Sequence, residues 1–168
     1  MYSVEQFLKS YRKEALVTIN LFSKIPPGGL DYRPTLGQRS TLELLRYLSY
    51  GPYNGVCRIV AGDWSLGVAT IEATKDMPAS DFPSRMAWQA NAVELIVRAA
   101  NPNSLLNDEI TFPWGETMKR GEGLINCPLK WVTAYRMQLF LYVKQAGASH
   151  LGTPEAWRPA PAVPAPVP

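Results

Sequence analysis

Apolar residues recur at spacings of three and four in four separate stretches of this chain, with proline and glycine between the stretches. Such spacing is typical of helices that bury one face. The apolar positions of the first stretch are Phe7, Leu8, Tyr11, Ala15, Ile19 and Phe22. Ser3 and Gln6 predict a capping box at its start, and the Pro-Pro-Gly-Gly run at residues 26–29 ends it. We therefore expect a first helix of about five turns.

The second helical stretch begins after Ser40 or Thr41, either of which can cap it, and is interrupted by Gly51 and Pro52. Helical spacing then resumes over residues 53–60. A proline inside a helix removes a backbone hydrogen bond. The sequence is therefore compatible with one helix kinked at the proline or with two short collinear helices.

The third and fourth helical stretches are also marked by prolines. The third begins at Asp81, with Pro83 in its first turn, and an Asn-Pro pair ends it. The fourth runs from about residue 120 to residue 145, and Pro128 should bend it or remove one hydrogen bond. Before it, apolar side chains alternate within residues 107–117, which predicts a short extended or hairpin segment.

These segments predict an all-α fold, a four-helix bundle. The connection between the second and third helices, residues 62–81, looks irregular and is long enough to cross the bundle. We expect residues 1–150 to form the bundle and residues 151–168 to form a proline- and alanine-rich tail, whose composition favours polyproline II. The tail is either loose or a strap that Trp157 anchors on this subunit or on a neighbour.

Composition argues against some partners and locations. The 168 residues carry a formal net charge of +3 and no long basic run. A nucleic-acid-binding protein usually concentrates positive charge on one face, so we expect no nucleic-acid partner. The start of the chain is charged, unlike a secretory signal, and no stretch approaches the ~18 apolar residues of a membrane span. We therefore expect a cytoplasmic protein with no membrane partner.

Histidine and cysteine usage limits the chemistry. His150 is the only histidine, and it lies beside the tail, where surface positions are common. Because imidazole is the commonest general base near neutral pH and the commonest metal ligand, a histidine-based site would have to use this one residue. Cys57 and Cys127 are far apart in the sequence. We expect two free, buried thiols, and a disulfide between them is the alternative.

Two stretches resemble a known family: DYRPTLGQRSTLELLRYLSY, at residues 31–50, and MKRGEGLINCPLKWVTAYRMQLFLYVKQAG, at residues 118–147. Together they resemble the DinB superfamily, whose patterns include an entry segment near RP, ELLxHL in the second helix and HxxxHRxQLxxYLxxxG in the last. Arg136, Gln138, Tyr142 and Gly147 fall in register with the last pattern. The resemblance implies a DinB-type four-helix bundle with a long crossover between helices two and three.

In that family three histidines hold a divalent metal, one on the second helix and two, four residues apart, on the last. The matching positions in this chain are Tyr47, Trp131 and Tyr135. The only nitrogen of a tryptophan side chain is a hydrogen-bond donor, and a neutral tyrosine, with a pKa near 10, is a poor ligand for a divalent metal. We therefore expect this chain to adopt the DinB-type fold without binding the divalent metal of the family, and we expect no cofactor.

The substituted positions define a candidate ligand pocket. Cys127, Trp131 and Tyr135 share one helical stripe, and the family packing would place Tyr47 opposite it, with Glu43 one turn earlier as a hydrogen-bond acceptor. The aromatic side chains could simply fill the volume left by the metal, or they could line a pocket for a small or aromatic ligand. A third alternative is metal-free catalysis with Cys127 as nucleophile, although no histidine can activate its thiol.

The resulting functional hypothesis is a non-catalytic protein that binds a small ligand or interacts with other proteins. The resemblance also predicts a homodimer, because DinB-like proteins often pair through helix faces. The alternative is a metal-independent or rebuilt-site enzyme related to the thiol-dependent transferases of the family.

Overall fold

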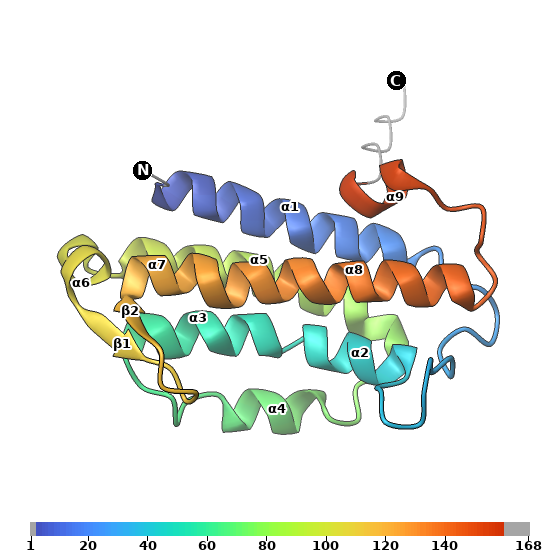
Figure 1. Ribbon diagram of the computed structural model, residues 1–168, viewed down its shortest axis with the longest axis horizontal. Coiled ribbons are helices and arrows are strands. Elements are labelled where there is room, and N and C mark those ends of the chain that lie inside the picture. The colour runs from blue at the N-terminus through green and yellow to red at the C-terminus, as the bar shows by residue number, and fades with distance from the viewer. Residues whose placement is uncertain (1–2, 160–168) are drawn as a thin grey trace, which may run out of the picture.

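The computed structural model describes residues 3–159, and within this range the chain folds as a helical bundle (Figure 1). The elements are α1 (Val4–Phe22), α2 (Thr41–Leu48), α3 (Gly51–Ala61), α4 (Val68–Thr74), a 3-10 turn (Ala79–Asp81), α5 (Phe82–Ala99), α6 (Pro102–Asn107), β1 (Glu109–Thr111), β2 (Thr117–Lys119), α7 (Arg120–Leu124), a π-helical turn (Ile125–Leu129), α8 (Lys130–Gln145) and α9 (Thr153–Trp157). Four long rods, namely α1, α2 with α3, α5, and α7 with α8, enclose one apolar core. The predicted all-α four-helix bundle is confirmed. No helix within residues 3–159 is both long and apolar enough to span a bilayer.

Side chains cap two of the rods as the sequence predicts. At the start of α1, the Ser3 hydroxyl accepts a hydrogen bond from the Gln6 amide while the Gln6 side chain accepts one from the Ser3 amide. Ser40 and Glu43 form the same reciprocal pair at the start of α2. Each pair satisfies two backbone amides that have no partner inside the helix, and so fixes where the helix begins.

The second rod is broken into α2 and α3 at Gly51 and Pro52, which confirms the two-helix alternative. In an unbroken helix the amide at position 52 would donate to the Leu48 carbonyl, but proline has no N–H. The buried side chain of Gln89, on α5, replaces the missing bonds. Its Nε2 donates to the Leu48 carbonyl at 3.0 Å, and its Oε1 accepts from the Tyr53 amide at 2.9 Å. The break is thus stabilised from a different helix.

The fourth rod accommodates its proline in a different way. Pro128 lies in the π-helical turn Ile125–Leu129, where the wider backbone spacing tolerates the missing donor. The axis continues from α7 into α8 (Figure 1). The predicted disturbance at Pro128 is therefore present as a local widening of the helix.

Two short helices lie in segments that the sequence analysis left irregular or unassigned. The crossover contains α4, and Gly67 at its start has φ +101°, a conformation in which a Cβ atom would also lie 2.5 Å from the Asn54 side chain. The Asn-Pro pair that ends α5 also starts α6, because the Asn101 side chain accepts from the Asn103 amide at 2.9 Å and Pro102 fits the first turn. The prediction of an irregular crossover was therefore wrong over Val68–Thr74.

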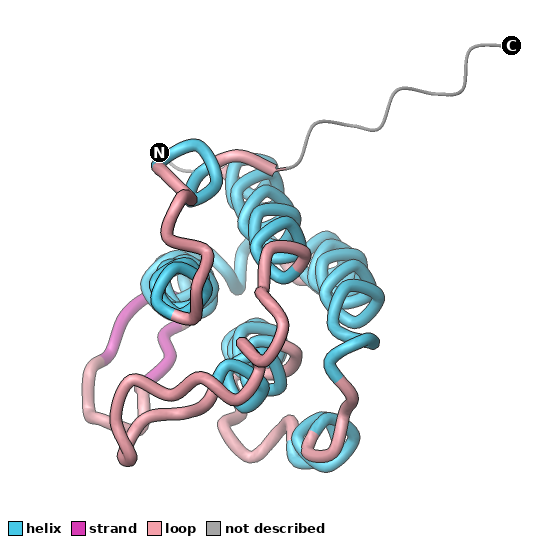
Figure 2. Tube along the Cα trace, turned by 90° about the vertical axis from the view of Figure 1, so that its right-hand side faces the viewer, coloured by secondary structure: helices cyan, strands magenta, loops and turns pink. Residues whose placement is uncertain are grey.

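The predicted hairpin forms between α6 and α7. Strands β1 and β2 are antiparallel, with Ile110 opposite Met118. Figure 2 shows the two strands in magenta. Ile110 is buried against the core and Pro113 lies in the connecting loop, outside both strands. The hairpin closes one end of the bundle together with α6.

The segment after the bundle packs against it as far as residue 159. Helix α9 lies on α1 and α8 (Figure 1). It covers Arg136, which is 0% exposed and forms an ion pair with Glu14 on α1. The Arg136 guanidinium also donates to the Ala156 carbonyl and lies 4.6 Å from the centre of the Trp157 ring. This part of the chain is therefore a strap anchored on its own subunit, while the tail expected over residues 160–168 lies outside the described residues.

Candidate functional site

Two of the three positions that the resemblance matched to metal ligands, Tyr47 and Tyr135, meet between α2 and α8. The rings of Tyr47 and Tyr135 pack edge to face, with their centroids 4.6 Å apart. Tyr50 packs against Tyr47 at 5.3 Å, and the Arg39 guanidinium lies 4.3 Å from the centre of the Tyr47 ring. The structure thus brings the predicted pair of tyrosines together in an aromatic cluster.

Glycines on α3 allow these aromatic side chains to approach the helix backbone. A Cβ atom on Gly51 would lie 2.9 Å from the Tyr47 ring, and one on Gly55 would lie 3.3 Å from the Trp131 ring. Trp131 therefore packs one turn further along α3 than Tyr47 does. This close packing favours the interpretation in which aromatic side chains fill the space between the helices.

The predicted polar members of the site have other partners. The Glu43 carboxylate accepts from the Ser40 amide at 2.7 Å and forms an ion pair with Arg33 at 2.9 Å. Its pKa is held below the usual value by the Ser40 hydrogen bond first and by Arg33 second. Glu43 therefore acts as a helix cap on the bundle surface, and the sequence analysis did not foresee the contribution of Arg33.

The protonation states in this region do not suit acid–base or thiol chemistry at neutral pH. Cys127 is fully buried in the π-helical turn, and burial raises the pKa of its thiol to about 12. Burial, and then the neighbouring Tyr135 phenol, raises the pKa of Tyr47 above its ordinary value. Both cysteines are free thiols, with Cys127 buried and Cys57 half-buried. A reactive cysteine needs the opposite shift, toward a lower pKa.

No cluster of three or more histidine, cysteine, aspartate or glutamate side chains within residues 3–159 could hold a metal ion. His150 is exposed beside the strap.

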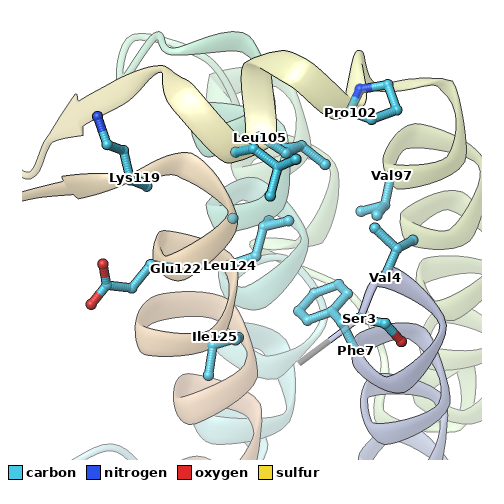
Figure 3. Close-up of a pocket in the computed structure, with 12 residues that line it drawn as sticks. Ser3, Val4, Phe7, Val97, Pro102, Leu105, Lys119, Glu122, Leu124 and Ile125 are labelled. Carbon is cyan, nitrogen blue, oxygen red and sulfur yellow. The ribbon is translucent and has the colours of Figure 1, made fainter. Parts of the chain in front are cut away.

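A second candidate site lies at the end of the bundle where α1 begins. A cavity of about 410 Å³ opens there between α1, α5, α6 and α7 (Figure 3). Its lining residues are Ser3, Val4, Phe7, Val97, Pro102, Leu105, Leu106, Lys119, Gly121, Glu122, Leu124 and Ile125. Most of these side chains are apolar, as in many small-molecule sites.

No local sequence pattern predicts this cavity. Its walls combine α1, at the start of the chain, with α5, α6 and α7, and α6, which supplies Leu105 and Leu106, was not predicted. The signal that could have revealed α6 is the Asn-Pro pair, which is as good a helix start as a helix stop.

The fold of this chain is similar to that of a solved structure over most of its length. The crystal structure of a DinB-like protein, YjoA from Bacillus subtilis, is similar to this chain with a TM-score of 0.64. The two share 18% sequence identity, and the similarity covers 84% of this chain and 92% of that one. No protein-family model and no curated protein sequence matches the chain. The resemblance inferred from the sequence is thus confirmed at the level of the fold.

Proposed function

We propose that this protein is a non-catalytic binding protein for a small molecule, built on a DinB-like bundle. The observation that carries the proposal is the cavity of about 410 Å³ between α1, α5, α6 and α7. Pockets of roughly 300–1,000 Å³ with mostly apolar walls are the usual sites for small ligands. Four of the wall residues, Phe7, Val97, Leu105 and Leu124, are buried in the core, so the bundle itself holds the walls in place.

The alternative, a metal-independent enzyme related to thiol-dependent transferases, has less support. Such an enzyme would use Cys127 as nucleophile, but this thiol is inaccessible and its pKa is raised to about 12. The candidate acids, Tyr47 and Tyr135, pack against each other. These observations support a role for the aromatic cluster in holding α2, α3 and α8 together.

The proposal is tested by binding of Nile red, an uncharged fluorescent dye, to the full chain. Leu106→Trp should fill the mouth of the cavity without unfolding the protein, because Leu106 is 60% exposed. We expect this variant to weaken dye binding at least about tenfold, which corresponds to ~1.4 kcal/mol. The matched control is Leu141→Trp, since Leu141 is 51% exposed on α8 and does not line the cavity. Equal dye binding by both variants, or none by the unmodified protein, would refute the proposal.

We also propose that the protein forms a homodimer. Trp88 and Leu95 are exposed large apolar side chains seven residues apart on α5, so they share one face of that helix. Aromatic residues of this kind are enriched at protein interfaces. Light scattering after size exclusion should give twice the monomer mass, and Leu95→Glu should return the monomer. A monomer at micromolar concentration in the unmodified protein contradicts this proposal.

A further inference from the structure

The charged side chains at the margin of the cavity already have partners. The Lys119 ammonium donates to the Asn107 carbonyl and to the Glu109 carboxylate, both at 2.9 Å. The Glu122 carboxylate accepts from the Asn126 amide at 3.5 Å. In Figure 3 the Glu122 carboxylate points away from Phe7 and Leu105. A charged ligand would therefore have to compete with these bonds to reach either group.

Within residues 3–159, no polar side chain reaches the centre of the cavity. Phe7, Val97, Leu105 and Leu124 face one another across it (Figure 3). The Ser3 hydroxyl lies at the edge and already accepts from the Gln6 amide. Moving a charged group from water to such a place without a hydrogen-bond partner is strongly unfavourable. An apolar group gains free energy in proportion to the surface it removes from water.

We propose that the cavity selects an uncharged, hydrocarbon-like ligand, such as a fused aromatic or cyclic terpenoid ring system, and discriminates against ions of the same shape. This inference rests on the proposed function. A dry apolar cavity of about 150 Å³ can hold benzene. The cavity here, at about 410 Å³, has room for more than one ring.

The experiment uses four probes of nearly the same shape: methylnaphthalene, naphthylmethanol, naphthoate and naphthylmethylamine. Each competes with Nile red for the full chain at neutral pH, where the last two are charged. We expect both uncharged probes to bind at least about tenfold tighter than either ion, because the ions must lose hydration without finding a partner. Leu106→Trp should weaken binding of both uncharged probes.

A second variant tests whether ligand preference comes from the apolar walls of the cavity or from the charged side chain of Lys119 at its margin. Lys119→Met removes the only ammonium among the described residues that line the cavity. We expect it to change no affinity by more than about twofold, because Lys119 is engaged with Asn107 and Glu109.

The outcomes distinguish the two proposals. Competition by none of the four probes, together with no Nile red binding, would overturn the proposed function itself. Tight binding of naphthoate that Lys119→Met abolishes, or equal binding of all four probes, would leave a binding protein but overturn the selection of an uncharged ligand. If Leu106→Trp loses self-association while probe binding is unchanged, a second copy of the chain covers the cavity. That outcome would also overturn the selection of an uncharged ligand.

Discussion

Replacing Gln89 by leucine should destabilise the protein more than any other single change of a glutamine. The side chain of Gln89 on α5 is 0% exposed, and its hydrogen bonds reach three other helices, α1, α2 and α3. Besides the Leu48 carbonyl and the Tyr53 amide, it accepts a hydrogen bond from the Tyr11 hydroxyl on α1 at 3.0 Å. Leucine has nearly the same volume, so the loss is of hydrogen bonds and not of packing.

The magnitude follows from the groups that leucine would leave unpaired. Leu48 and Tyr53 would each keep a buried backbone group without a partner, and Tyr11 would keep a buried hydroxyl. A buried polar group that loses its partner costs roughly 1–3 kcal/mol, so we expect the three groups together to lower the free energy of unfolding by about 3–9 kcal/mol. Because domains are stable by only about 5–15 kcal/mol, this is a large fraction of the total.

The assay is unfolding in urea followed by circular dichroism. Tyr11→Phe removes only the hydrogen bond between Tyr11 and Gln89, so we expect the free energy of unfolding to fall by about 1 kcal/mol. This variant can be measured even where Gln89→Leu fails to fold. The matched control is Gln145→Leu, because Gln145 is an exposed glutamine whose side chain accepts a hydrogen bond from the Tyr32 hydroxyl at 2.7 Å. Unfolding of Gln89→Leu at the same urea concentration as the control, with an unchanged slope, would refute the argument that Gln89 stabilises the proline break.

Four further predictions concern buried pairs, glycine contacts and protonation. Arg136→Met leaves the Glu14 carboxylate without its partner, so urea unfolding should show a loss of about 3 kcal/mol or more; a neutral result contradicts this. Gly55→Val should cost about 1–3 kcal/mol, because even one Cβ atom lies 3.3 Å from its neighbours. Because burial raises the pKa of Cys127 to about 12, its thiol should react with a disulfide reagent at neutral pH only as fast as the protein unfolds; faster labelling rejects this. The pKa of the Glu43 carboxyl is lower in the folded state than its ordinary value of 4.5. The ionised carboxylate therefore stabilises the fold above pH 4.5, and this stabilisation is lost as the pH falls through the folded-state pKa. The difference in unfolding free energy between Glu43→Gln and the unmodified protein should accordingly shrink in acid.

The sequence by itself determined the four long rods of the bundle, but not the short helices α4 and α6. Helix starts at Ser3 and Ser40 follow from local capping chemistry, in which each side chain reaches an amide three residues away. The break at Pro52 follows from a missing N–H. These features depend on neighbours in the chain, and spacing and residue type were therefore sufficient to predict them. The hairpin was predicted less completely, because of the alternating residues Ile110, Phe112 and Trp114 only Ile110 lies in a strand.

The resemblance to a known family predicted which candidate residues lie close together. The resemblance placed Tyr47 on one helix and Tyr135 on another, and the structure brings their rings to 4.6 Å. It did not show that Glu43 would instead bind Arg33, because that contact depends on how the preceding connector folds back.

Only the tertiary structure decided where the cavity lies and how the buried polar groups are satisfied. The cavity is bounded by residues of α1, α5, α6 and α7, and the bonds of Gln89 join α5 to residues about 40 and 80 positions away in the chain. Neither depends on a local pattern, because each results from the volume and the hydrogen-bonding groups that remain after distant helices pack together. The periodicity of a sequence indicates which face of a helix is buried. Which residues pack against that face depends on the tertiary structure of the whole chain.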